Sequence, residues 1–95
     1  MIWMIAAAKL KLYMPWVHSL KEKRMVVKSI CAKVKNRYNV SIAEVEEQDI
    51  HQTAVLEFAA VAGDRAQADS ILDHVINYIE NNTDGELIQV ERDIL

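Results

Sequence analysis

The chain has 95 residues, of which 52% are hydrophobic and 26% charged, with two glycines, one proline and one cysteine. This length predicts a single domain over residues 1–95, and so few glycines exclude a glycine-rich phosphate-binding loop. The longest apolar run, Met1–Ala8, is far shorter than the ~20 residues of a membrane span, and it lacks the basic flank of a signal peptide. One cysteine forms no intrachain disulfide, so we expect a small cytoplasmic domain.

The formal net charge of −3 conceals an asymmetry along the chain. Residues 1–37 contain nine of the 11 Lys and Arg residues and one acid, whereas residues 38–95 contain the other two and 13 acids. The first part can form a basic face that binds an anion, or its cations can pair with the acidic part. Composition leaves both interpretations open.

The first two elements follow from periodicity and capping. Alternating apolar residues predict a strand over Ile2–Tyr13, with lysines in its second half on the solvent side. A helix is expected from Ser19 to about Arg37, because Ser19 and Glu22 form an S-x-x-E capping box.

Three strands and a helix remain. Val40–Glu46 and Gln52–Ala62 are rich in strand-forming residues and are joined by a polar bend. Asp64 caps a second helix, whose apolar stripe recurs at i, i+3, i+4 and i+7 up to Ile79. Glu86–Ile94 is the last predicted strand, with Ile88 and Val90 on its apolar side.

The predicted order β-α-β-β-α-β indicates an α+β, ferredoxin-like fold. Two crossovers place both helices on one face of a four-stranded antiparallel sheet of order 4-1-3-2. The other face of such a sheet is open to solvent or to a binding partner.

Catalytic patterns are absent from the sequence. The three histidines lack metal-ligand spacing, and Cys31 falls in the apolar arc of the first helix, where it is expected to be a packed thiol. Acylphosphatases share this topology, but their loop after the first strand is glycine-rich and carries an arginine, unlike Met14–His18. We therefore expect no enzyme, no metal and no cofactor. An enzyme acting on a phosphorylated small molecule at the first helix start stays a weaker alternative.

Cations gather on the first helix, where they predict an anion or nucleic-acid site. At about 100° per residue most of them share one narrow stripe, and a helix start favours anions. Lys9 and Lys11 can extend this track over the open sheet face. In the alternative interpretation the cations pair with Glu44, Glu46 or Glu47, and Lys23, near the apolar arc, buries its stem and pairs its ammonium. The candidate residues are Ser19, Lys21, Lys23, Arg24, Lys28 and Lys35.

The open face of the predicted sheet also carries an apolar excess. It lacks the paired aromatics on which RNA-recognition folds of this topology stack bases. An apolar patch of this kind more often packs against another subunit. The residues of this candidate dimer interface are Trp3, Ile5, Ala7, Val55, Ala59 and Val61.

The segments Ser19–Arg24, Asn36–Ser41 and Ala43–Val45 resemble the YlxP-like proteins, the domain of unknown function 503, and the likeness covers essentially the whole chain. The resemblance implies a ferredoxin-like fold, a homodimer and no assigned activity. In many bacteria such genes lie among those for transcription elongation, translation initiation and ribosome maturation. Our first hypothesis is a non-catalytic accessory module that binds ribosomal RNA or a ribosomal subunit. The alternative is a homo-oligomeric interaction module with no nucleic-acid partner, and neither hypothesis includes a membrane or a small-molecule substrate.

Overall fold

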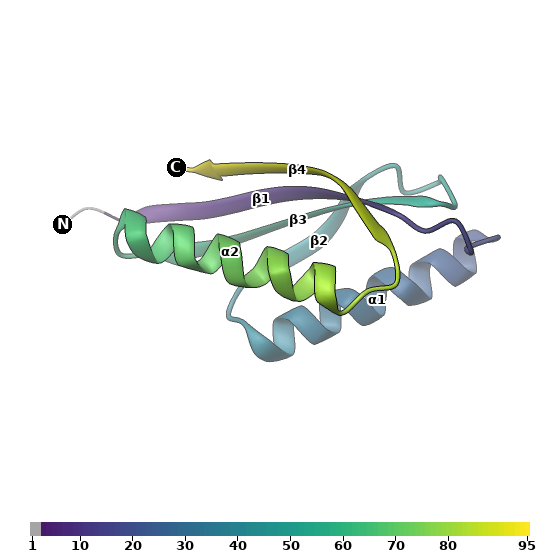
Figure 1. The fold of residues 1–95 in the computed structure, drawn as a ribbon, viewed down its shortest axis with the longest axis horizontal. Coiled ribbons are helices and arrows are strands. Elements are labelled where there is room, and N and C mark those ends of the chain that lie inside the picture. Colours follow the sequence, from purple (N-terminus) through teal and green to yellow (C-terminus); the bar gives the residue numbers. More distant parts are fainter. Residues whose placement is uncertain (1–2) are drawn as a thin grey trace.

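The computed structural model describes residues 3–95 (Figure 1). Its order, βαββαβ, is the predicted one. The predicted first residue of the first strand, Ile2, lies outside the described residues. The elements are β1 (Met4–Tyr13), α1 (Leu20–Arg37), β2 (Ser41–Glu46), β3 (Thr53–Ala62), α2 (Arg65–Asn81) and β4 (Glu86–Ile94).

The four strands form one antiparallel sheet of order β2-β3-β1-β4, and both helices lie on the same side of it (Figure 1). This confirms the predicted ferredoxin-like topology, with the two most apolar strands at the centre. Ile5 and Leu95 exchange two backbone hydrogen bonds of 2.9 Å. The start of β1 and the end of β4 are therefore held together at one end of the sheet.

Every second side chain of the central strands points toward the helices, and these side chains form the core. Ala6, Ala8, Leu10 and Leu12 of β1 are buried beneath the helices, as the period-two pattern predicts. The α2 stripe packs onto them through buried residues one turn apart. Each helix begins as predicted, because Ser19 and Asp64 each accept a hydrogen bond from a backbone N–H of the first turn.

Both edge strands contain a bulge that shifts their side-chain alternation. In β4 the register changes opposite Lys11 and Leu12, so that Gln89 pairs with Lys11 but Leu87 pairs with Leu12. Ile88 has no partner in the ladder and is 48% exposed, whereas Leu87 packs against the core. Val90 lies opposite Leu10 but is also 40% exposed, so the apolar residues of β4 that pack against the core are Leu87 and Ile94 rather than the predicted Ile88 and Val90. The bulge inserts one extra residue into a period of two and so moves Leu87 onto the core side.

A buried cation joins α1 to the edge of the sheet. Lys23 is fully buried, and its Nζ lies 2.8 Å from the Glu44 carboxylate of β2. The same ammonium donates to the carbonyls of Glu47 at 2.5 Å and Ile50 at 2.6 Å in the β2–β3 loop. Two carbonyl acceptors and a paired carboxylate compensate the buried charge, so a lysine is tolerated in the interior.

The two helices pack together over only part of their length. The end of α1 contacts the second half of α2, where the rings of Tyr38 and Tyr78 meet edge to face at 5.6 Å between centroids. The first half of α1 extends beyond the end of α2, as Figure 1 shows. On one side that half faces the turn between α2 and β4.

Lys23→Met should lower the free energy of unfolding by about 3–5 kcal/mol, because it leaves the Glu44 carboxylate buried without its partner. Denaturant unfolding measures the loss. The matched control is Lys28→Met on the exposed side of α1, expected within about 0.5 kcal/mol of the wild type. The double variant Lys23→Met, Glu44→Leu should recover part of the stability. Equal losses for the two single variants would contradict the structural role of Lys23.

Candidate functional site

The exposed side of α1 carries a row of cations. Among the described residues none of them forms an ion pair with an acid. Residues three or four apart on a helix are neighbours, so the first three members adjoin one another. We call this set the basic face of α1; it consists of Lys21, Arg24, Lys28 and Lys35, all exposed.

If the basic face paired within the molecule, its partners would be Glu44, Glu46 and Glu47, but these glutamates already pair with other lysines. Lys9 Nζ lies 2.8 Å from the Glu46 carboxylate, and Lys11 Nζ lies 2.8 Å from that of Glu47. Glu44, the third candidate, pairs with the buried Lys23. The predicted pairing thus exists, but its cations come from β1 and from the inner side of α1 rather than from the basic face.

Two residues of the predicted anion site are engaged in other interactions. Lys23 is enclosed, and its ammonium already binds one carboxylate and two carbonyls, so Lys23 does not belong to the anion site. Its predicted buried pairing with a carboxylate is confirmed. Ser19 Oγ accepts the Glu22 backbone N–H at 3.0 Å, and the Glu22 carboxylate accepts the His18 N–H at 3.3 Å. A carboxylate therefore already occupies the start of α1, where a bound anion would compete with it.

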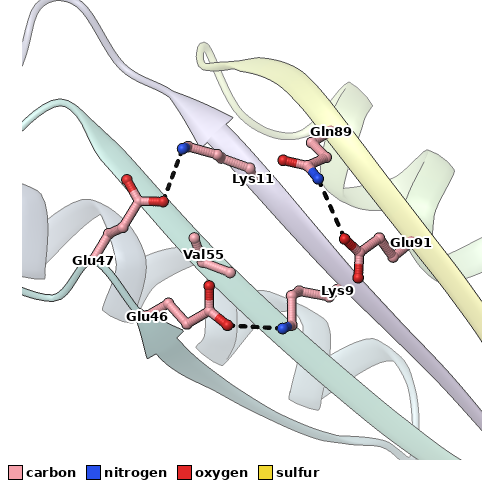
Figure 2. Close-up of a pocket in the computed structure, with 7 residues that line it drawn as sticks. All are labelled: Lys9, Lys11, Glu46, Glu47, Val55, Gln89 and Glu91. Atoms are coloured by element: carbon pink, nitrogen blue, oxygen red, sulfur yellow. Dashed lines mark hydrogen bonds and ion pairs between the residues drawn. The ribbon is translucent and has the colours of Figure 1, made fainter.

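The charged half of the open sheet face is a network of side chains laid across β3 (Figure 2). The pairs Lys9–Glu46 and Lys11–Glu47 join β1 to the end of β2 and the following loop, and the central strand runs beneath them. Val55 lies between the two pairs and is only 3% exposed. This corrects two predictions: Val55 is not part of an exposed interface, and the two lysines do not extend the basic face.

Glu47 shapes this network from an unusual backbone conformation. Its φ of 56° is in the left-handed region, which few residues other than glycine adopt. The carboxylate turns back over the sheet, where Thr53 Oγ1 donates to it at 2.7 Å and Lys11 pairs with it. Hydrogen bonds from Lys11 and Thr53 lower the pKa of the Glu47 carboxyl. The hydrogen bond to Glu46 likewise raises the pKa of Lys9.

The other half of the open face is apolar and exposed. Trp3 is 62% exposed and Val61 is 72% exposed, as predicted for interface candidates. Leu95, opposite Ile5, is 68% exposed and belongs to the same surface, but the sequence pattern of β4 gave no sign of it. Lys35 of the basic face lines a concavity with Ile5 and Val61 at this end. We call this surface the apolar end; it comprises Trp3, Ile5, Ala7, Ala59, Val61 and Leu95.

Groups capable of redox or metal chemistry are few. Cys31 is half-buried on α1, and burial raises the pKa of its thiol, which disfavours the reactive thiolate. Within residues 3–95 no group of three or more His, Cys, Asp or Glu side chains is arranged to hold a metal ion. No helix over the same residues is long and apolar enough to cross a membrane.

Comparisons with known proteins agree on the family and the fold. Residues 5–92 match the family described as "Protein of unknown function (DUF503)". The chain is 43% identical over 63 residues to the "Uncharacterized protein YlxP" of Bacillus subtilis (strain 168), which covers 66% of this chain and 68% of that protein.

Among solved structures, a designed protein with a ferredoxin fold, LFR1 1, has a TM-score of 0.56 at 16% identity and covers 98% of this chain and 85% of its own. The designed protein Foldit4 has a TM-score of 0.55 at 11% identity over 99% of this chain and 97% of its own. At these identities the similarity is one of fold alone.

The depressed pKa of Glu47 predicts an acid-dependent loss of stability. Its folded pKa lies below the ordinary 4.5, so the native state binds the proton less readily than the unfolded chain. The stabilisation is complete above that value and is lost as the pH falls through the folded pKa. Glu47→Gln should therefore be less stable than the wild type near neutral pH, and the difference should shrink below pH 4.5. Thermal melts across this range measure it, with Glu80→Gln at an exposed position of α2 as the matched control substitution.

Proposed function

Because this chain belongs to the family of proteins of unknown function DUF503, its relatives supply no activity, and we propose from its geometry that it is a non-catalytic cytoplasmic module that binds RNA phosphates through α1. The observation that carries the proposal is the unpaired basic face of α1, beside acids that are already paired with other cations. Phosphate contacts by Lys and Arg supply most of the sequence-independent affinity for nucleic acid.

The size of the basic face suits a run of phosphates. Lys21 and Lys35 are 14 positions apart on one helix, a span of about 21 Å at 1.5 Å per residue. The helix has a single acid, Glu22, which is engaged at its start. Elsewhere the chain is acidic, and the net charge is −3. An RNA strand is therefore attracted to one side of the molecule and repelled by the rest, which fixes the orientation of binding.

Ribosomal RNA, free or within a ribosomal subunit, is the RNA partner that we propose. Binding by backbone contacts requires no defined sequence, and it suits a folded RNA with a dense array of phosphates. The association should weaken steeply with salt, because each neutralised phosphate releases counterions.

Lys21→Gln with Lys28→Gln should remove two phosphate contacts. The slope of log K against log salt for a short RNA should become less steep by about 0.7–0.9 per contact, with weaker binding at low salt. Fluorescence anisotropy measures binding to labelled RNA, and co-sedimentation extends it to ribosomal subunits. Lys9→Gln removes an ion-paired lysine on the sheet face and is the control expected to bind like the wild type. Absence of RNA binding by the wild type at low salt would refute the proposal.

The apolar end supports a second function, homodimerisation in an interaction module with no nucleic-acid partner. Three large apolar side chains are more than 60% exposed there, and water-exposed patches of this kind favour association. A standard interface buries about 800 Å² per partner, roughly a seventh of the 5856 Å² surface of this chain.

Val61→Glu should convert a dimer into a monomer, because it places a charge at the centre of the apolar end of both copies. Equilibrium sedimentation of the wild type and the variant measures the change. Ile50→Glu, exposed in the β2–β3 loop, is the control expected to remain dimeric. A wild type that is monomeric at every accessible concentration removes this second function.

A further inference from the structure

A groove beside the basic face of α1 has no role in either function. It lies between the first half of α1 and the turn that joins α2 to β4, and its volume is about 310 Å³. Trp16 forms one wall and Met25 another, and Lys33 lies farther along α1. We call this the Trp16 groove.

The walls of the Trp16 groove are held by hydrogen bonds. Trp16 follows Pro15 in a tight turn in which the Val17 N–H donates to the Met14 carbonyl at 3.1 Å. Gln52 at the start of β3 donates from Nε2 to the Pro15 carbonyl at 3.1 Å. Proline fixes the backbone at this turn position, so the part of the chain that carries Trp16 is constrained.

The opposite wall is equally constrained. Asn82 Nδ2 donates to the Tyr78 carbonyl at 2.9 Å, and the Gly85 N–H donates to Thr83 Oγ1 at 3.1 Å. A Cβ at Gly85 would lie 3.2 Å from both Met14 Cγ and the Tyr13 carbonyl oxygen, so this turn packs tightly onto the end of β1. A groove between two fixed walls can receive a flat group with little loss of conformational entropy.

The apolar side chains of the groove are exposed among charges. Met25 is 66% exposed although Lys21 and Lys28 are its neighbours one turn away on α1, and Trp16 is 38% exposed. Aromatic rings provide stacking surfaces for bases, and cations beside them attract the phosphates that the bases carry. Asp84 at the far wall can accept a hydrogen bond from an N–H group on a base edge.

We propose that the Trp16 groove stacks one base of a single-stranded RNA segment on the indole of Trp16, while the adjoining phosphates lie on the basic face of α1. This rests on the proposed function, because the basic face supplies the affinity for the backbone. The charge pattern favours this occupant: Lys33 lines the groove on α1, Lys21 and Lys28 lie one turn from Met25, and the carboxylate of Asp84 at the opposite wall keeps a second phosphate away. A flexible, unpaired segment is required, since a base within a duplex is already stacked.

The experiment compares an oligouridine with an abasic strand of the same length, so that base and phosphate binding separate. The wild type should bind the oligouridine about tenfold more tightly than the abasic strand, the order expected for one stacked base. Trp16→Ala should abolish that difference and leave the abasic affinity unchanged. Met25→Ala, which shortens only an exposed uncharged side chain, should also weaken the oligouridine more than the abasic strand. Val61→Ala on the sheet face is the control that should retain the wild-type difference.

A fluorescence readout tests the stacking directly. In a Trp3→Phe background Trp16 is the one remaining tryptophan, and its emission should be quenched by the oligouridine but not by the abasic strand. Equal affinities for the two strands, or an unchanged emission on binding, overturn the groove proposal while leaving the phosphate-binding function intact. Failure of both strands to bind refutes both proposals. Quenching by an apolar peptide but by neither strand assigns the groove to a protein partner and also overturns the proposal.

Discussion

The placement of α1 against the sheet depends on the contacts that the buried ammonium of Lys23 makes. This ammonium is a charge without access to water, so it must retain its carboxylate partner and its two carbonyl acceptors, which come from β2 and from the loop that follows it. The position of α1 against the sheet edge and the course of the β2–β3 loop are thereby set together. Glu47 transmits this constraint to the other face, because its carbonyl binds Lys23 beneath the sheet while its carboxylate binds Lys11 above it.

This arrangement distributes the charges of a nearly balanced chain. The acids at the end of β2 are each occupied by a lysine of β1 or by Lys23, and Arg92 of β4 binds Asp73 of α2 at 2.6 Å. The outer cations of α1 are left without acidic partners among the described residues. From the sequence, the cations either pair with the acids of the chain or form a free basic face. In the structure both occur, because the lysines of β1 and Lys23 pair with the acids while the outer cations of α1 do not.

Local patterns predicted most of the fold. Period-two alternation defined β1, the serine and aspartate caps defined the helix starts, and the order of elements permitted few topologies. The position of Lys23 near the apolar arc was sufficient to predict its buried pairing. The exposed cations of α1 and the exposed Trp3 and Val61 were also recognisable, since each depends only on the face of its own element.

Features that depend on distant parts of the chain could not be predicted. The bulge that displaces Ile88 arises from pairing with β1, and no residue type in β4 signals it. Val55 has the sequence signature of an exposed strand position, but side chains from two other strands meet above it. The Trp16 groove joins a turn near the start of the chain to one more than 60 positions later, so its existence follows from tertiary packing alone.

The hydrogen bonds between Ile5 and Leu95 have a practical consequence for handling this protein. Both ends of the described chain lie at one extremity of an elongated body 48 Å in its longest dimension, and the start of α1 lies at the other (Figure 1). An affinity tag or a surface linkage at either terminus would sit beside the apolar end and point the first turns of α1 into solution. Immobilised protein would therefore present its basic helix to analytes while the linkage hindered self-association.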